Sequence, residues 1–320
     1  IFINFIILIG ILLILEVSTR IALYFYRADA DAGMAGRNSN LVYQPFVMFG
    51  DDYNKKVKYF NAKESDYNIL ILGGSTAQLW SNEIIFNQFE NYFADENLKI
   101  FNSAYSGYNS RQELIFFTIW GRYIKPDLVI SLDGANDIIN GLRKQKIGSF
   151  FPNSSYELLL LRPYLGPLVF ILQHSQFYNS ILRVFARFEK FEIEDYIENI
   201  DIYIESQRNI SEISEIYNAK HISILQPYAG FKKTKHEEEI KNFSHYIYRD
   251  KLVKELYELT DEKMRDLHKN TKSIYIDSRG FYDEYEVEIF ADDVHFISDE
   301  GYKILTNKII EELGKSKFKN

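Results

Sequence analysis

Short runs of apolar residues alternate with longer segments of helical spacing over most of the chain. The apolar runs are Ile69–Leu72, Leu98–Phe101, Leu128–Ile130, Ile222–Leu225 and Ile274–Ile276. Short apolar runs separated by helices are typical of a parallel sheet that is covered by helices on both faces. The pattern therefore predicts an α/β fold with a mostly parallel, five-stranded sheet.

Several of the intervening segments have the periodicity of helices. They are Glu83–Phe93, Ser110–Gly121, Asp250–His268 and Ser298–Leu313. At the start of the last one, the hydroxyl of Ser298 is suited to cap the helix, because it can accept a hydrogen bond from a backbone N–H of the first turn. An apolar stripe follows at helical spacing, formed by Tyr302, Leu305, Ile309 and Leu313. We expect this stripe to pack in the core rather than to bind a cofactor.

Two stretches interrupt the alternation. Asn140–Lys220 begins with strongly apolar segments and continues as an acidic helix, so we interpret it as a helical insertion over the sheet. The charged segment Lys232–Arg249 indicates a loop or lid. Residues 28–66 are polar, contain Gly and Asn and lack sustained periodicity, which predicts a linker. The main domain is therefore expected at residues 67–320, with the insertion at about 140–220.

The amino terminus is strongly apolar. Ile1–Leu15 carries no charge, and a second apolar patch follows at Ile21–Tyr26. A helix that spans a membrane needs about 20 apolar residues. The charge-free run is shorter, but the chain starts without Met, so we expect further residues upstream. Glu16 and Arg20 are four residues apart and can pair on one helix face. We therefore interpret residues 1–27 as a transmembrane anchor.

Two other interpretations of this segment stay open, namely a buried helix of the soluble domain and a cleaved signal peptide. The small-residue pattern at Ala28–Ala30 lies too far beyond the apolar run for ordinary cleavage, which favours an uncleaved anchor. We expect a single-pass membrane protein whose main domain is extracytoplasmic. Arg20 and Arg27, taken alone, favour the opposite orientation under the positive-inside rule.

Composition narrows the classes of function. The chain has no cysteine, which excludes zinc ribbons, cysteine nucleophiles and disulfide frameworks. Its formal net charge of -8 at pH 7 argues against a nucleic-acid partner, since neutralising phosphates requires a basic face. The sequence has no Gly-rich phosphate-binding motif, and His236–Glu239 lacks the second histidine of a zinc-binding helix. We therefore expect neither a metal nor a nucleotide cofactor.

A candidate nucleophile follows the first predicted strand. That strand runs directly into Gly73–Ala77, which contains Ser75. A serine at a strand-to-helix turn exposes its hydroxyl at the carboxyl edge of the sheet, where open α/β folds bind ligands. The preceding glycines permit the tight turn, and the N–H groups at the start of the helix can face an oxyanion. A plain turn with a capping serine is the alternative.

A candidate general base lies near the other end of the chain. His295 precedes the final helix, and Asp292 and Asp293 come just before it. A neutral histidine can take a proton from a serine hydroxyl when a carboxylate holds its other ring nitrogen, and a carboxylate three residues away can do so. The alternative is that His295 is an ordinary loop residue and that the aspartates are caps.

Two short motifs between these ends also follow predicted strands. Gly107 lies after the second strand, and Asn136 lies after the third. The backbone N–H of Gly107 and the side-chain amide of Asn136 could each donate to a substrate oxygen and so form an oxyanion hole. Taken singly, each is more simply explained as a turn residue.

Taken together and in this order, the four segments resemble the sequence blocks of the SGNH (GDSL-like) hydrolase superfamily. The segments are Gly73–Thr76, Gly107, Gly134–Asp137 and Asp292–His295, and the resemblance extends from about Asn68 to Leu313. It implies a flavodoxin-like three-layer α/β/α fold. It also implies a nucleophile at Ser75, a general base at His295, an orienting carboxylate at Asp292, and oxyanion donors at Ser75, Gly107 and Asn136. An α/β-hydrolase fits less well, because its nucleophile follows several strands.

The sequence departs from the family pattern in two places. Gly74 occupies the position of the aspartate in Gly-Asp-Ser, a replacement that is common among relatives resembling bacterial envelope enzymes, and the 140–220 insertion matches no block. An anchored SGNH domain resembles enzymes that act on acylated glycans, so we expect an esterase for O-acetyl groups of a carbohydrate. The alternatives are an O-acyltransferase with the same acyl-enzyme, a lipid esterase and a catalytically silent, membrane-tethered binding module.

Overall fold

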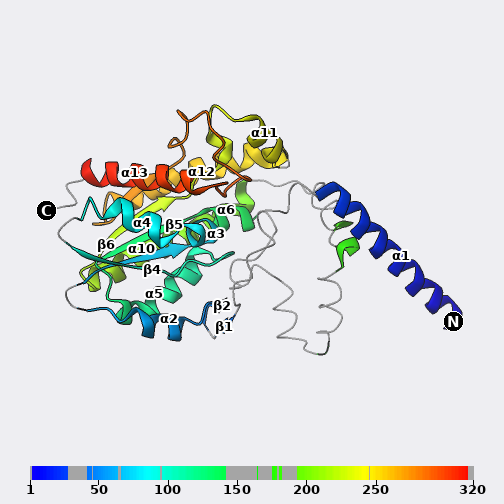
Figure 1. Ribbon diagram of the computed structural model, residues 1–320, viewed down its shortest axis with the longest axis horizontal. Helices are drawn as coiled ribbons and strands as arrows, with labels where there is room; N and C mark the ends of the chain where they lie inside the picture. The colour runs from blue at the N-terminus through cyan, green and yellow to red at the C-terminus, as the bar shows by residue number, and fades with distance from the viewer. Residues whose placement is uncertain are drawn as a thin grey trace. The chain divides into compact units, whose positions relative to one another are not determined.

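Figure 1 shows the computed structural model of the protein, which describes residues 2–27, 42–44, 46–63, 66–93, 96–141, 164, 175–178, 180–181, 193–244 and 246–315. The chain divides into two compact units, which we describe separately. One comprises residues 1–38 and 145–191, and the other comprises residues 39–144 and 192–320. Most of residues 142–192, which belong to the predicted insertion, lie outside the described residues. Residues 28–41 of the predicted linker also lie outside them.

The larger unit is built on a five-stranded sheet. Its strands are β3 (Asp66–Gly73), β4 (Asn97–Asn102), β5 (Leu128–Asp133), β6 (Lys220–Leu225) and β7 (Ile274–Asp277). Every neighbouring pair is parallel, in the order β4-β3-β5-β6-β7. Each predicted apolar run forms one of these strands, so the prediction of a parallel five-stranded sheet is confirmed. The order is that of flavodoxin-like sheets, in which ligands bind beyond the carboxyl ends of the strands.

Helices cover both faces of the sheet (Figure 1). On one face, α4 (Asn82–Phe89) packs against α13 (Asp299–Lys315). On the other face, α10 (Ile197–Ile216) contacts both α5 (Ser110–Ile124) and α12 (Ile247–His268). Right-handed crossovers produce this division from the observed strand order. The part of the predicted insertion that precedes β6 is therefore α10, together with the single turn η2 (Ile193–Tyr196), and it covers the sheet between β5 and β6.

The predicted helices form with shifted ends. The helix expected at 83–93 ends at Phe89, and Phe93 packs instead on the ring of Tyr67 in β3, with 4.7 Å between the ring centroids. Helix α13 begins after Ser298, whose hydroxyl accepts a hydrogen bond from the Glu300 N–H. The predicted stripe along this helix is buried, with Leu305, Ile309 and Leu313 fully inaccessible and Tyr302 nearly so. It is part of the core, as expected.

The segment before the sheet differs from the predicted linker. It contains β1 (Val42–Gln44), β2 (Met48–Gly50) and α2 (Tyr53–Phe60). Tyr53 is fully buried, and its ring lies 4.7 Å from that of Phe116 and 5.2 Å from that of Trp120, both on α5. Its hydroxyl donates to the carbonyl of Ser103, at 3.0 Å. Tyr53 therefore joins α2 to the core, although lysines along α2 obscure its apolar face in the sequence.

The smaller unit contains the long amino-terminal helix α1 (Phe2–Arg27). Glu16 pairs with Arg20 at 2.8 Å, as expected. Its carboxylate also accepts hydrogen bonds from the Ser175 hydroxyl and from the N–H groups of Gln176 and Phe177. In the described part of the chain, no helix is long and apolar enough to cross a membrane, so the predicted transmembrane segment is not supported there.

Candidate active site

The candidate nucleophile lies where β3 ends. The strand stops at Gly73, Gly74 caps the next helix, and Ser75 is the first residue of α3 (Ser75–Leu79). The Gln78 N–H donates to the carbonyl of Gly74 at 3.0 Å and so closes the first helical turn. This turn brings the Ser75 side chain to the carboxyl edge of the sheet, as predicted from the sequence.

Gly74 leaves room for a side chain from another segment. A Cβ atom at this position would lie 2.4 Å from Nδ2 of Asn136, which is far inside van der Waals contact. Asn136 belongs to α6 (Ala135–Gly141), which follows β5. The close approach of the Asn136 amide therefore favours a glycine at position 74.

His295 lies between Ser75 and Asp292. Its Nε2 atom is 2.7 Å from Oγ of Ser75, although 220 residues separate the two in sequence. Its Nδ1 atom is 2.7 Å from Oδ2 of Asp292. The other oxygen of Asp292 accepts hydrogen bonds from the N–H groups of Val294 and His295, at 2.8 and 2.7 Å. Asp292 therefore fixes both the histidine ring and the backbone of its loop.

The surroundings of Asp292 favour its ionised form. Burial by itself would raise the pKa of this carboxyl group. The hydrogen bond and charge of His295, together with the N–H groups of the same loop, outweigh burial and lower the pKa below its ordinary value. An ionised Asp292 can accept a hydrogen bond from the Nδ1–H group of His295, which leaves Nε2 as the acceptor that faces Ser75.

The neighbouring Asp293 has a different partner. Its carboxylate is buried and pairs with the guanidinium group of Arg249, at 2.5 Å. Burial raises the pKa of Asp293 although Arg249 opposes the shift. Arg249 lies in the first turn of α12, so this pair joins the loop that contains His295 to that helix. Asp292 rather than Asp293 is thus the carboxylate that contacts the histidine.

The two candidate oxyanion segments meet beside Ser75. Gly107 has a φ of +83°, a conformation that favours glycine. The next residue, Tyr108, accepts a hydrogen bond through its carbonyl from Nδ2 of Asn136, at 2.7 Å. Because the same amide also lies against Gly74, Asn136 connects the Gly107 loop with the Ser75 turn. The structure therefore brings all the predicted site segments together.

A group of buried carboxyl side chains comes from β5 and from the helices α5 and α6. It consists of Glu113, Asp133 and Asp137, each at most 3% exposed. Asp137 accepts hydrogen bonds from the N–H and hydroxyl groups of Ser110, the first residue of α5, and so fixes the end of the Gly107 loop. Burial and the charge of Asp133 raise the pKa of Asp137 to about 7. Burial, followed by the charge and hydrogen bond of Asp133, raises the pKa of Glu113 well above its usual range.

The segment predicted as a loop or lid is fixed to the loop that precedes His295. It directly follows η3 (Ala229–Phe231) and contains α11 (Glu237–Phe243) and the start of α12. Lys232 and Glu239 form a buried ion pair of 2.7 Å. Glu239 also accepts hydrogen bonds from the N–H groups of Ile289 and Phe290, and Lys232 donates to the carbonyl of Val287. These buried contacts make the segment a support for the histidine loop.

Sequence reasoning missed Gln226 and gave no role to Thr76. Gln226 directly follows β6, and its side-chain amide donates to the hydroxyl of Thr76 at 2.6 Å. Both residues are buried. A position just after the carboxyl end of a strand was one signal that selected Ser75, Gly107 and Asn136, and Gln226 has the same position after β6.

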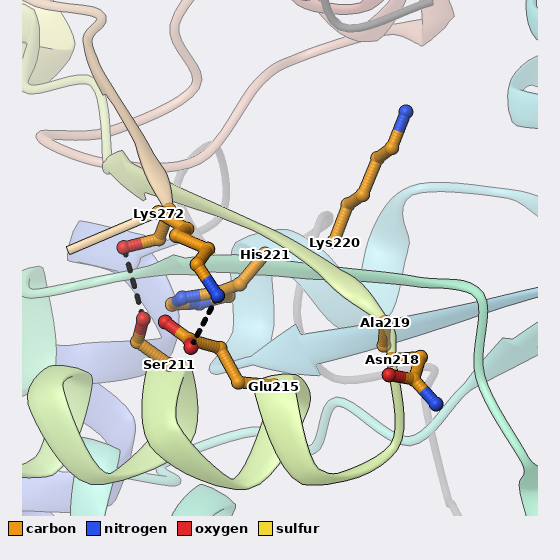
Figure 2. Close-up of a pocket in the computed structure, with 8 residues that line it drawn as sticks. Ser211, Glu215, Asn218, Ala219, Lys220, His221 and Lys272 are labelled. Atoms are coloured by element: carbon orange, nitrogen blue, oxygen red, sulfur yellow. Dashed lines mark hydrogen bonds and ion pairs between the residues drawn. The ribbon is translucent and has the colours of Figure 1, made fainter. Parts of the chain in front are cut away.

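A polar pocket lies at the opposite edge of the sheet. It measures about 230 Å³ and lies at the amino end of β6, where Lys220 and His221 begin the strand. Figure 2 shows His221 inside it, beside the ion pair of Lys272 with Glu215, while Lys220 points away. Burial, with a smaller effect of His268, lowers the pKa of His221 to about 3, so the ring is neutral near pH 7. This pocket is separate from the Ser75 site.

Comparison with known proteins gives structural matches alone. No family model and no curated protein matches the chain. Solved structures with a similar fold include Axe2, an acetylxylan esterase from Geobacillus stearothermophilus (13% identity, 79% of this chain and 97% of that chain, TM-score 0.46). They also include a GDSL-like lipase from Bacteroides thetaiotaomicron (13%, 83% and 98%, 0.46) and LAE5, an α/β hydrolase enzyme from the metagenome of Lake Arreo (13%, 80% and 97%, 0.48).

Proposed function

We propose that the protein is an SGNH-type serine hydrolase that cleaves acyl esters, with Ser75 as nucleophile, His295 as general base and Asp292 as the orienting carboxylate. The observation that supports this most strongly is the pair of 2.7 Å contacts from Ser75 through His295 to Asp292. A nucleophile, a base and a third group in this geometry are the requirements for activating a serine hydroxyl.

In the proposed reaction, Oγ of Ser75 attacks the ester carbonyl carbon as Nε2 of His295 takes the hydroxyl proton. Asp292 stabilises the imidazolium that forms. When the tetrahedral intermediate collapses, the bond to the alcohol oxygen breaks and His295 returns the proton to that oxygen. A water molecule then attacks the acyl-enzyme with the same general base, which releases the acid and restores Ser75.

The oxyanion is proposed to be stabilised by the N–H groups of Ser75 and Gly107 and by the Asn136 amide. An amide NH2 group has two hydrogens. One of them is donated to the carbonyl of Tyr108, which orients the group, and the other remains for the substrate oxygen. Such donors are most effective when they are held in place before charge develops.

For the substrate, we propose an O-acetyl ester of a carbohydrate. The support is the resemblance of an anchored SGNH domain to enzymes that act on acylated envelope glycans. The Gly-Gly-Ser-Thr nucleophile block, which is common among relatives that resemble bacterial envelope enzymes, agrees with it. Transfer of the acyl group to a sugar hydroxyl is the second candidate, because the same acyl-enzyme can react with water or with an alcohol.

Attachment to a membrane through residues 1–27, with the hydrolase domain on the extracytoplasmic side, is a separate part of the proposal. Its support is the exposure of apolar side chains along α1, among them Leu13 at 60%, Ile14 at 66% and Val17 at 53%. Removing apolar surface of this kind from water is favourable, and a lipid surface would provide the partner.

One experiment tests the activity and separates its variants. The full chain is incubated with p-nitrophenyl esters of increasing acyl length, with and without a glycan acceptor, beside Ser75→Ala as the matched control. We expect acetate to be the preferred acyl group and Ser75→Ala to be inactive. Faster turnover of long acyl chains would indicate a lipid esterase, and acetylation of the acceptor would indicate a transferase. Hydrolysis of no ester would contradict the proposed function.

A further inference from the structure

A second link joins the Ser75 turn to the His295 loop. The hydroxyl of Thr76 donates to the carbonyl of Val294 at 3.1 Å. Thr76 directly follows Ser75, and Val294 directly precedes His295. The contact between Ser75 and His295 is therefore accompanied by a contact between their chain neighbours.

Gln226 fixes this second link from a third element. Its Nε2 atom donates to Oγ1 of Thr76 at 2.6 Å and lies 3.5 Å from the carbonyl oxygen of Val294. Its own N–H donates to the carbonyl of Asp133 at the end of β5. With an N–H donor already directed at its oxygen, the Thr76 hydroxyl has its proton free to point at Val294. The three groups thus form one hydrogen-bonded chain.

The backbone of Thr76 is held as well. Its carbonyl accepts a hydrogen bond from the hydroxyl of Tyr302 on α13, at 2.9 Å. Thr76 is fully buried and Gln226 is 3% exposed, so water cannot replace these partners easily. A buried polar group that loses its partner is costly, and the geometry is correspondingly well determined.

These contacts differ in kind from the bond between Ser75 and His295. That bond joins two side chains, each of which can rotate about its own torsion angles. The Thr76 hydroxyl, in contrast, binds a backbone carbonyl and so limits how far the two main-chain segments can separate. A displacement of about 1 Å between reacting groups can reduce a rate about 100-fold.

We infer that Thr76 and Gln226 are positioning residues, which set the distance between Ser75 and His295 by holding the nucleophile turn against the histidine loop. The inference rests on the proposed function. Neither residue touches the reacting atoms. Their effect is on the proton transfer from Ser75 to His295, while the surfaces that bind the substrate are left unchanged.

The test compares Thr76→Val, Thr76→Ser and Gln226→Leu with the unmodified full chain. Thr76→Val removes the hydroxyl at nearly constant volume, and Thr76→Ser restores it. For Thr76→Val and Gln226→Leu we expect kcat to fall about 10- to 100-fold. KM should stay within about 2-fold, because substrate contacts are not changed. The rate of Ser75 labelling by a fluorophosphonate should fall in parallel, and Thr76→Ser should recover most of both.

Thr260→Val is the matched control. Thr260 is also fully buried, and its hydroxyl donates to a backbone carbonyl, that of Leu256 within α12. Loss of a hydroxyl with a purely structural role lowers the melting temperature and leaves kcat per folded molecule unchanged. We expect that result for Thr260→Val. Should Thr76→Val fail to fold, Gln226→Leu tests the same hydrogen-bonded chain, because it removes the Nε2 donor that orients the Thr76 hydroxyl.

The outcomes separate this inference from the proposed function. An unmodified chain that neither hydrolyses esters nor reacts with fluorophosphonate would contradict the function itself. An active chain in which Thr76→Val and Gln226→Leu keep full kcat and full labelling rate, as Thr260→Val does, would overturn the positioning role and leave the function standing. A rise in KM at constant kcat would also overturn it, since that is the signature of a lost substrate contact.

Discussion

At the scale of single residues, the two aspartates before His295 have separate environments. Asp292 holds Nδ1 of His295, whereas Asp293 is paired with Arg249. The sequence favoured Asp292 through the Asp-x-x-His pattern of the resemblance. The partner of Asp293 was not predictable, because Arg249 is 44 residues away in sequence and reaches the loop through the packing of α12.

The roles of the two aspartates can be separated by amide substitution. In Asp292→Asn the carboxylate that accepts the Nδ1 proton is lost, so the wrong ring nitrogen faces Ser75, and we expect kcat to fall by roughly 10,000-fold. Asp293→Asn should mainly lower thermal stability, because it removes the buried carboxylate that pairs with the partly buried Arg249 guanidinium group. Measuring kcat and the melting temperature on the same preparations distinguishes the catalytic role of Asp292 from the structural role of Asp293. The reverse ranking of kcat would reassign the orienting role to Asp293.

Gly74 provides a test of the oxyanion hole. A methyl group in Gly74→Ala would meet Nδ2 of Asn136 at 2.4 Å and must displace the amide. We therefore expect Gly74→Ala to resemble Asn136→Ala, with kcat and kcat/KM lower by about 100- to 1000-fold and KM nearly constant. Both variants are assayed with p-nitrophenyl acetate beside their melting temperatures. Normal kcat in a destabilised Asn136→Ala enzyme would remove Asn136 from the proposed site.

At the scale of elements, local pattern and long-range packing explain what could be predicted. The strands could be predicted from the sequence because burial on both faces requires continuous apolar runs such as Ile69–Leu72. The core helix α2 could not be predicted, because its role depends on the contact of Tyr53 with α5, more than 60 residues later. The link from Gln226 to Thr76 spans 150 residues and leaves no local pattern. The candidate site was found in sequence only where its residues form short motifs.

Helix α5 contains a buried carboxyl group whose titration affects stability. In the folded chain, burial and the neighbouring Asp133 raise the pKa of Glu113 well above 4.5, whereas the unfolded chain releases this proton near pH 4.5. The folded state therefore binds more protons above that pH, and this group makes stability fall as the pH rises. The slope is about 1.4 kcal/mol per pH unit until the folded group itself ionises.

Glu113→Gln should remove this contribution, because glutamine does not ionise and its amide can still donate to Asp133. We expect the stability of the variant relative to the unmodified protein to increase from pH 5 to pH 8, as measured by chemical denaturation. Glu90→Gln, at an exposed glutamate after α4, is the matched control and should show no such trend. An equal difference at both pH values for Glu113→Gln would mean that Glu113 is ionised in the folded protein.

At the scale of the whole molecule, the two compact units suggest a division of roles. The unit of residues 39–144 and 192–320 contains the sheet and every residue of the proposed site. The unit of residues 1–38 and 145–191 contains α1 with its exposed apolar side chains. Because the larger unit begins at residue 39 and α2 contributes Tyr53 to its core, removal of the amino-terminal helix must stop before residue 39 if this unit is to stay intact.

The proposed membrane attachment predicts how the protein fractionates. The full chain should sediment with membranes and stay there after carbonate extraction, whereas a chain without residues 1–27 should be released in active form. Esterase activity in the two fractions, measured with p-nitrophenyl acetate, is the readout. A full chain found in the soluble fraction would refute the attachment.

The most direct measurement for the central claim is the site of covalent labelling by a fluorophosphonate probe. Only a serine beside a general base is activated enough to attack phosphorus, so the account predicts one labelled residue, Ser75, in the peptide map of the unmodified chain. Ser75→Ala should remain unlabelled, and His295→Ala should react far more slowly. Labelling that persists at full rate in Ser75→Ala, or that maps to another serine, would contradict the account.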